Sequence, residues 1–239
     1  MTEMRSGTAT PLVSFALSRG LTMSEIQQAT GVSCEDMMSP EARLPDDVMP
    51  NLWLLLAERF PHAPLTLEMA RAAPFSFFGG LAEGAQFADD LKTALTLLVE
   101  NATIIANRIE LRLVETETDA RLTASHPLDA LDGGRSAETG AAIANRLIIE
   151  FFGIEDALTR VMLAHSPHCE ESNYAAFFGV PVEFEADVTA LVINRNKLQT
   201  RIQHANLELF RYVETHFAAV QKQITTTKEP EPLTKLRRA

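Results

Sequence analysis

The sequence is poor in cysteine, which limits the redox chemistry that the chain can support. Only Cys34 and Cys169 occur among the 239 residues, and they lie far apart in the sequence. A fold that depends on disulfides needs a dense framework of paired cysteines. We therefore expect both side chains to be reduced thiols without a catalytic role.

Long apolar runs are also missing. No run approaches the roughly 20 residues that a membrane-spanning helix needs. The first ten residues lack the basic and then apolar order of a signal peptide. Hydrophobic residues still make up 46% of the chain, enough for a sizeable buried core. We expect a soluble, cytoplasmic protein that does not associate with membranes.

Positive charge is scarce over most of the chain. The net charge is −11, whereas a surface that binds nucleic acid must neutralise phosphates. Residues 201–239 hold seven Lys and Arg residues against four Glu residues, a balance of +3, which leaves −14 for residues 1–200. An acidic body followed by a basic end argues against DNA binding by the body itself.

Catalytic signatures are absent from the sequence. There is no Gly-x-Ser-x-Gly, no P-loop, no Gly-x-Gly-x-x-Gly after a strand and no His-Glu-x-x-His. The sequence therefore predicts a non-enzymatic protein without a cofactor. The one cluster typical of metal binding is His165, His168 and Cys169. A closed zinc site needs four ligands and no nearby residue supplies a fourth, so we expect no metal here.

Hydrophobic periodicity predicts an α+β fold. Thr22 and Glu25 have the spacing of a capping box, and alternating apolar residues over 109–113 and 120–124 predict an antiparallel hairpin. Further helices are predicted over 86–107, 136–152, 170–178 and 197–223, and further strands over 160–165, 182–184 and 191–193. We expect an N-terminal helical subdomain, residues 1–60, packed on a twisted antiparallel sheet with flanking helices and a long C-terminal helix, residues 61–223.

Residues 21–38 have the helical pattern of a DNA-binding helix-turn-helix. A recognition helix that begins near Ser33 would present Cys34, Glu35 and Asp36 to the DNA groove. Carboxylates would repel the phosphates, so we favour a structural role for this segment.

Two motifs in residues 160–195 indicate a family. His165-x-Pro167 follows the predicted strand, and residues 174–184 read Tyr-x-x-Phe-Phe-Gly-x-Pro-Val-x-Phe. With these motifs the chain resembles the N-terminal effector-binding and dimerisation domain of AraC/XylS transcription regulators. The likeness extends from Leu12 to Phe217. It departs from the family pattern over residues 60–65, where a Gly-Asp-Pro-like turn is usual.

Other segments support the resemblance. They are Ser18-Arg-Gly-Leu, Arg43-Leu-Pro and the helix, strand, strand block over residues 87–124. The resemblance implies a ligand-sensing domain that controls an attached helix-turn-helix DNA-binding domain. Residues 224–239 are then a polar, proline-bearing linker and the truncated start of that domain. The alternative is a stand-alone small-molecule or haem sensor that acts through a partner protein, with His126 or His165 as the axial haem ligand.

The resemblance also implies site residues. An apolar effector pocket is expected where the helices over 86–107 and 136–152 meet the strand that ends at His165. The predicted ligand-binding residues are Phe77, Phe78, Leu95, Val99, Ile148, His165 and Tyr174. A homodimer is expected through the apolar side of the C-terminal helix, with Leu209, Phe210, Val213 and Phe217 as the contact residues.

Overall fold

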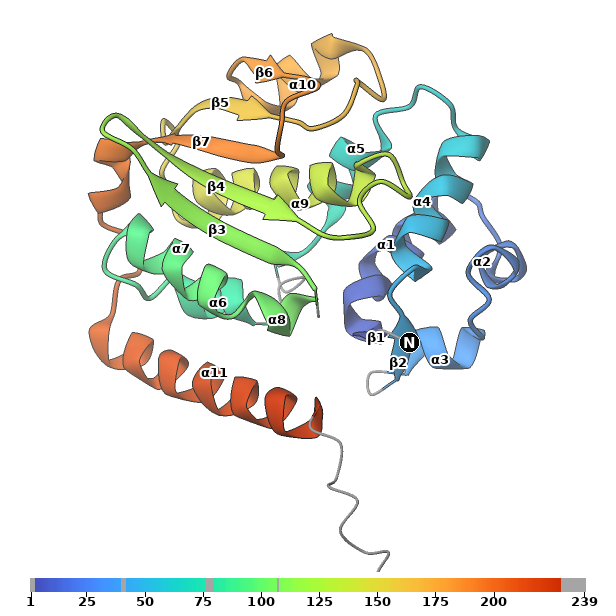
Figure 1. The fold of residues 1–239 in the computed structure, drawn as a ribbon, viewed down its shortest axis with the longest axis horizontal. Coiled ribbons are helices and arrows are strands. Elements are labelled where there is room, and N and C mark those ends of the chain that lie inside the picture. The colour runs from blue at the N-terminus through green and yellow to red at the C-terminus, as the bar shows by residue number, and fades with distance from the viewer. Residues whose placement is uncertain (1–2, 40–41, 76–79, 107, 229–239) are drawn as a thin grey trace, which may run out of the picture.

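A five-stranded sheet forms the centre of the fold (Figure 1). The computed structural model describes residues 3–39, 42–75, 80–106 and 108–228. The sheet has the order β3-β4-β7-β5-β6. Its strands are β3 (Glu110–Glu115), β4 (Asp119–Ser125), β5 (Leu158–Met162), β6 (Val182–Glu183) and β7 (Ala190–Asn194). The predicted α+β class and the β3–β4 hairpin are confirmed.

One strand pair departs from the antiparallel expectation. β6 runs parallel to β5, with Val161 opposite Val182, whereas the other neighbours are antiparallel. A parallel pair needs a crossover connection, and helix α10 (Glu171–Phe178) supplies it. As predicted, α10 ends at Gly179, which has φ of 67°.

The helices beside the sheet begin and end at identifiable caps. α9 (Arg135–Arg146) packs against β4 and β7 and continues into the π-helical turn η2 (Leu147–Phe151). α7 (Leu91–Glu100) packs against β3 and is followed by α8 (Ala102–Ile105). The helix predicted over 86–107 is therefore shorter and divided. The Asp90 side chain accepts a hydrogen bond from the Thr93 amide at 2.8 Å, which fixes the start of α7.

The N-terminal segment consists mainly of helices that pack on α4 (Figure 1). Its elements are β1 (Glu3–Arg5), α1 (Ser6–Ser18), α2 (Met23–Thr30), α3 (Cys34–Met38), β2 (Arg43–Pro45) and α4 (Val48–Arg59). The predicted capping box is confirmed, since Thr22 and Glu25 each accept a hydrogen bond from the other's backbone amide. α5 (Leu65–Ala72) follows and packs against α9.

The C-terminal segment corrects the prediction of one helix over 197–223. A 3₁₀ helix η3 (Arg195–Gln199) is separated from α11 (Leu207–Lys228). Between them the chain is held by the segment before α7: the Ile202 amide donates to the Asp89 carbonyl and the Asn206 amide to the Phe87 carbonyl. The Asn206 side chain then caps α11. In this segment the long-range hydrogen bonds take the place of the backbone hydrogen bonds that a continuous helix would form.

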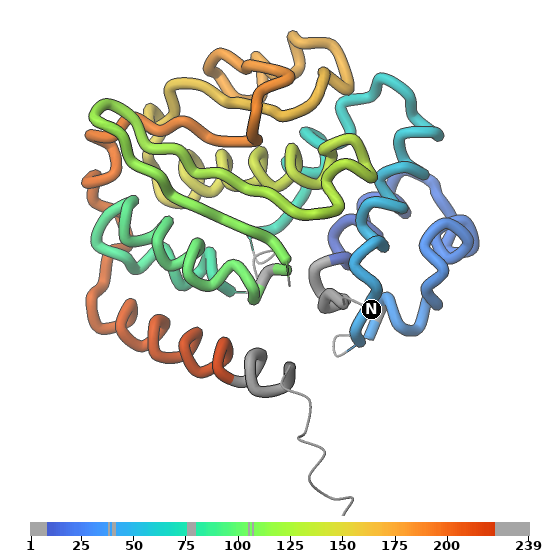
Figure 2. Tube along the Cα trace, viewed as in Figure 1, coloured from blue at the N-terminus to red at the C-terminus, as the bar shows by residue number. Residues whose placement is uncertain are grey.

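α11 lies along α6 (Leu81–Ala85) and α8, as the chain trace in Figure 2 shows. Gly84 makes this close approach possible, because a Cβ atom there would lie 2.5 Å from Val213 Cγ1. Phe210 and Phe217 of α11 belong to the main hydrophobic core. Within the described part of the chain, no helix combines the length and apolar character needed to cross a membrane.

Candidate functional site

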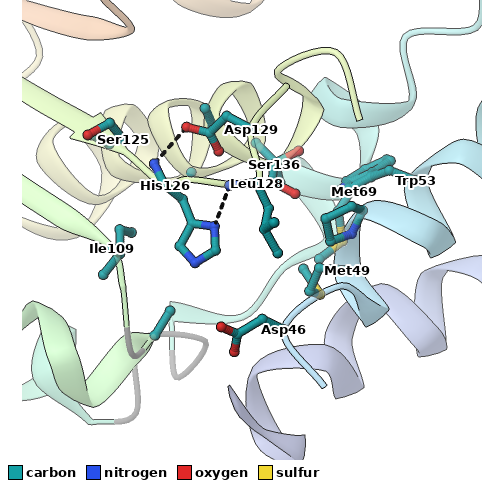
Figure 3. A pocket seen from close by; sticks show the side chains of 16 residues that line it. Asp46, Met49, Trp53, Met69, Ile109, Ser125, His126, Leu128, Asp129 and Ser136 are labelled. Carbon is teal, nitrogen blue, oxygen red and sulfur yellow. Dashed lines mark hydrogen bonds between the residues drawn. The ribbon is translucent and has the colours of Figure 1, made fainter. Parts of the chain in front are cut away.

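A cavity of about 130 Å³ lies between α4, the end of the β3–β4 hairpin and the start of α9. Figure 3 shows its lining side chains. We call it the Trp53–His126 cavity. It is lined by Asp46, Met49, Pro50, Trp53, Met69, Ala106, Ile109, Ala124, Ser125, His126, Leu128, Asp129, Ser136, Ala137, Thr139 and Gly140.

The walls of the cavity are mainly apolar, but Trp53 brings a polar atom to them. The Trp53 side chain is fully buried, and its Nε1 atom has no hydrogen-bond partner among the described residues. A buried donor without an acceptor costs about 1–3 kcal/mol. A ligand that offered an acceptor atom here would recover that free energy.

His126 supplies a second donor. Its Nδ1 accepts a hydrogen bond from the Leu128 amide at 3.2 Å, so in the neutral ring the proton is on Nε2. Burial and the nearby Arg108 guanidinium lower the pKa of His126, which favours this neutral form. Figure 3 shows the imidazole pointing into the space between Ile109, Leu128 and Asp46.

Two carboxylates and three hydroxyl residues, Ser125, Ser136 and Thr139, add to the polar part of the lining. Asp46 forms an ion pair with Arg108 at 3.1 Å. Asp129 accepts a hydrogen bond from the His126 amide at 2.7 Å, and burial raises the pKa of Asp129 to about 6. The cavity thus combines apolar walls with a few fixed polar groups, which is the composition of a small-molecule site.

Five of the seven predicted ligand-binding residues can be placed, and they lie outside this cavity. Phe77 and Phe78 lie outside the described residues, and none of the other five lines the Trp53–His126 cavity. Leu95 and Ile148 are buried in the core, and Val99 packs against it. Two sequence features coincide with the cavity: Trp53 is the single tryptophan of the chain, and His126-Pro127 follows the strand predicted over 120–124.

His165 and Tyr174 are brought together by a third side chain, Glu138 of α9, which is fully buried. The Tyr174 hydroxyl donates to Glu138 Oε2 at 3.2 Å, and the Thr66 hydroxyl donates to Oε1. Burial raises the pKa of Glu138 to about 7 and also raises the pKa of Tyr174. Burial lowers the pKa of His165, and that of His168 to about 4. At neutral pH the shifts favour the neutral forms of His165, His168 and Tyr174, whereas Glu138 is close to half protonated.

The predicted dimerisation residues divide between the two sides of α11. Phe210 and Phe217 are buried against the chain's own core, and Val213 packs beside them. Leu209 is 44% exposed, and Tyr212, which was not among the predicted residues, is 72% exposed. Of the four predicted contact residues, only Leu209 is exposed, so the exposed side of α11 consists mainly of residues that were not predicted.

Comparison with known proteins gives a family and a similar fold. The family model described as "Arabinose-binding domain of AraC transcription regulator, N-term" matches residues 20–202. The crystal structure of the transcriptional regulator CdpR from Pseudomonas aeruginosa is similar, with a TM-score of 0.61 and 16% sequence identity over 92% of this chain and 70% of that chain. At this identity the likeness establishes the fold alone. No curated protein matches the sequence.

Proposed function

Since the chain belongs to the family of arabinose-binding N-terminal domains of AraC transcription regulators, we propose that it senses a small-molecule effector in the Trp53–His126 cavity. Binding would shift the population between two arrangements of the domain, and an attached DNA-binding domain would respond to that shift. The observation that carries the proposal is the buried, unpartnered Nε1–H of Trp53 in an apolar cavity.

The cavity indicates the class of effector. Its volume of about 130 Å³ is below the roughly 300–1,000 Å³ of pockets for drug-sized ligands. A small molecule with an apolar body and one hydrogen-bond acceptor, such as a carboxylate or a hydroxyl oxygen, suits the donors of Trp53 and His126. Haem is much larger than this cavity, so the alternative of a haem sensor with His126 as axial ligand has little support.

Filling the cavity should abolish the response to effectors. Gly140 of α9 lines it, and a Cβ atom at Gly140 would meet no atom within 4 Å. We expect Gly140→Leu to fill the space without unfolding the chain, because leucine also favours a helix by about 0.8–1 kcal/mol over glycine. The readout is the fluorescence of Trp53, the only tryptophan, during titration with a library of small carboxylic acids and alcohols.

The matched control is Gly140→Ala, which gains the same helical preference but leaves most of the cavity empty. Compounds that change Trp53 fluorescence in the wild-type chain should still do so in Gly140→Ala and should fail in Gly140→Leu. An equal response in all three chains would show that effectors bind elsewhere.

Dimerisation is the second part of the proposal, and it uses the exposed side of α11. Leu209 and Tyr212 are large apolar side chains on this side. A second copy of the chain that covered them would be repelled by a buried, unpaired carboxylate. We expect Leu209→Glu combined with Tyr212→Glu to weaken the dimer at least about tenfold, measured by light scattering over a concentration series.

The control adds the same charge away from α11, with Ser172→Glu and Ala175→Glu on the exposed surface of α10. This control should leave the dimer intact. A wild-type chain that is monomeric, or a Leu209→Glu, Tyr212→Glu dimer of unchanged strength, would contradict dimerisation through α11.

A further inference from the structure

Three potential metal ligands, Glu138, His165 and His168, lie close together where α9 meets the loop between β5 and α10. Glu138 Oε2 lies 3.3 Å from His165 Nε2 and 3.9 Å from His168 Nε2. The two imidazole rings are stacked, with centroids 4.4 Å apart and an angle of 10° between their planes. Because the Nε2 lone pairs lie in the ring planes, one ring must rotate for both to meet at one ion. Ligand atoms of all three residues lie within 4.8 Å of one another.

The tautomer of His165 directs a lone pair towards this point. His165 Nδ1 lies 2.9 Å from the Ser166 carbonyl oxygen, which can only accept a hydrogen bond. The ring proton is therefore on Nδ1, and Nε2 is a free electron-pair donor. An imidazole that donates its other N–H to a carbonyl is the usual arrangement in metal-binding histidines.

The side-chain atoms of Glu138, His165 and His168 that meet here can all donate electron pairs, but no described Lys or Arg side chain forms an ion pair with them. The Nε2 atoms of His165 and His168 are buried and have no hydrogen-bond partner in the described part of the chain. Glu138 is fully buried, and no described Lys or Arg lies within ion-pair distance of it. A buried carboxylate is stable only when it is paired, protonated or bound to a metal.

From this geometry we propose that Glu138, His165 and His168 form a binding site for a zinc-type divalent cation. Zinc binds His nitrogen and carboxylate oxygen at about 2.0–2.2 Å, which in a tetrahedral site separates the ligand atoms by roughly 3.4 Å. The observed 3.3 Å and 3.9 Å are close to that separation. Two imidazoles and one carboxylate are a ligand set of open zinc sites.

The hydrogen-bond partners of the Glu138 carboxylate are already in place. The hydroxyls of Thr66 and Tyr174 hold the Glu138 carboxylate, as outer-shell partners do. A second cavity of about 260 Å³, lined by His168, Thr66 and Arg135 among others, adjoins the site. It gives room for a water molecule or a small anion as the fourth ligand. The ion would tie α9 to the loop between β5 and α10.

The proposal is tested on the full chain after removal of metals by a chelator. Calorimetric titration with Zn²⁺ should give one site per chain, and Zn²⁺ should raise the Tm. His168→Ala and Glu138→Gln each remove a ligand, so each should weaken binding by more than the roughly 10–100-fold that loss of an outer-shell partner costs. Neither variant should show the rise in Tm.

The controls separate this site from other zinc ligands on the chain. His204→Ala removes an exposed histidine and should leave the affinity unchanged. Cys169→Ser tests the neighbouring thiol, and Co²⁺ in place of Zn²⁺ should show no thiolate charge-transfer absorption. Circular dichroism of each metal-free variant checks folding. Absence of binding to the wild-type chain, or binding that survives in folded His168→Ala, would overturn the proposal.

Discussion

Gly134→Ala should lower the free energy of unfolding by about 2–5 kcal/mol. Gly134 has φ of 87°, a conformation that costs a residue with a Cβ atom about 1–2 kcal/mol. The new Cβ would also lie 2.5 Å from His165 Cδ2 and 3.0 Å from Cγ, so the half-buried ring must move. Such overpacking costs about 1–3 kcal/mol. Urea denaturation of the variant and the wild-type chain measures the loss.

The neighbouring glycine is the control for this prediction. Gly133 also has positive φ, at 65°, but its nearest neighbour would be Arg135 Nη1 at 3.3 Å, the end of a flexible side chain. Gly133→Ala should therefore lose only the conformational part, about 1–2 kcal/mol. Equal losses at both positions would mean that the approach of His165 to the backbone is not constrained.

Phe217→Ala should destabilise the chain by about 3–4 kcal/mol, because it removes a buried aromatic ring from the contact between α11 and α6. Phe217 is 7% exposed and packs closely against Gly84. The loss should be concentrated in α11, whose amides should exchange hydrogen faster. Urea denaturation gives the total loss, and hydrogen exchange followed by mass spectrometry locates it.

Glu214→Ala serves as the comparison on the same helix. Glu214 is exposed and lies outside the proposed dimer contact, and substitutions at such positions change stability by no more than about 0.5 kcal/mol. If Phe217→Ala were no more harmful than Glu214→Ala, or if α11 kept its protection from exchange, the docking of α11 on α6 would not be a source of stability.

Sequence patterns correctly predicted the features that depend on interactions between residues close together in the sequence. The Thr22–Glu25 capping box, the hairpin of β3 and β4 and the glycine that ends α10 each depend on residues a few positions apart. The break between η3 and α11 could not be predicted in this way. It depends on hydrogen bonds from residues 202 and 206 to residues 89 and 87, which periodicity within the segment does not report.

The candidate sites were harder to predict than the fold, for the same reason. The Trp53–His126 cavity joins residues of α4, of the hairpin and of α9, and each residue taken alone has the pattern of ordinary core or loop. The histidine pair was visible in the sequence, but Glu138 belongs to a different element and is distant along the chain. A buried glutamate in a helix gives no sequence signal that distinguishes it from an exposed one.

The docking of α11 has a mechanical consequence. The helix has 22 residues, so at a rise of 1.5 Å per residue it is a rod about 33 Å long. It is held through Phe210, Val213 and Phe217, and its last turns extend past that contact (Figure 1). A tilt of about 10° about the first turn would carry the far end by about 6 Å over that length. A shift of about 2 Å where α6 contacts Val213 and Phe217 would thus become, at the far end of the helix, a displacement on the scale of a whole side chain.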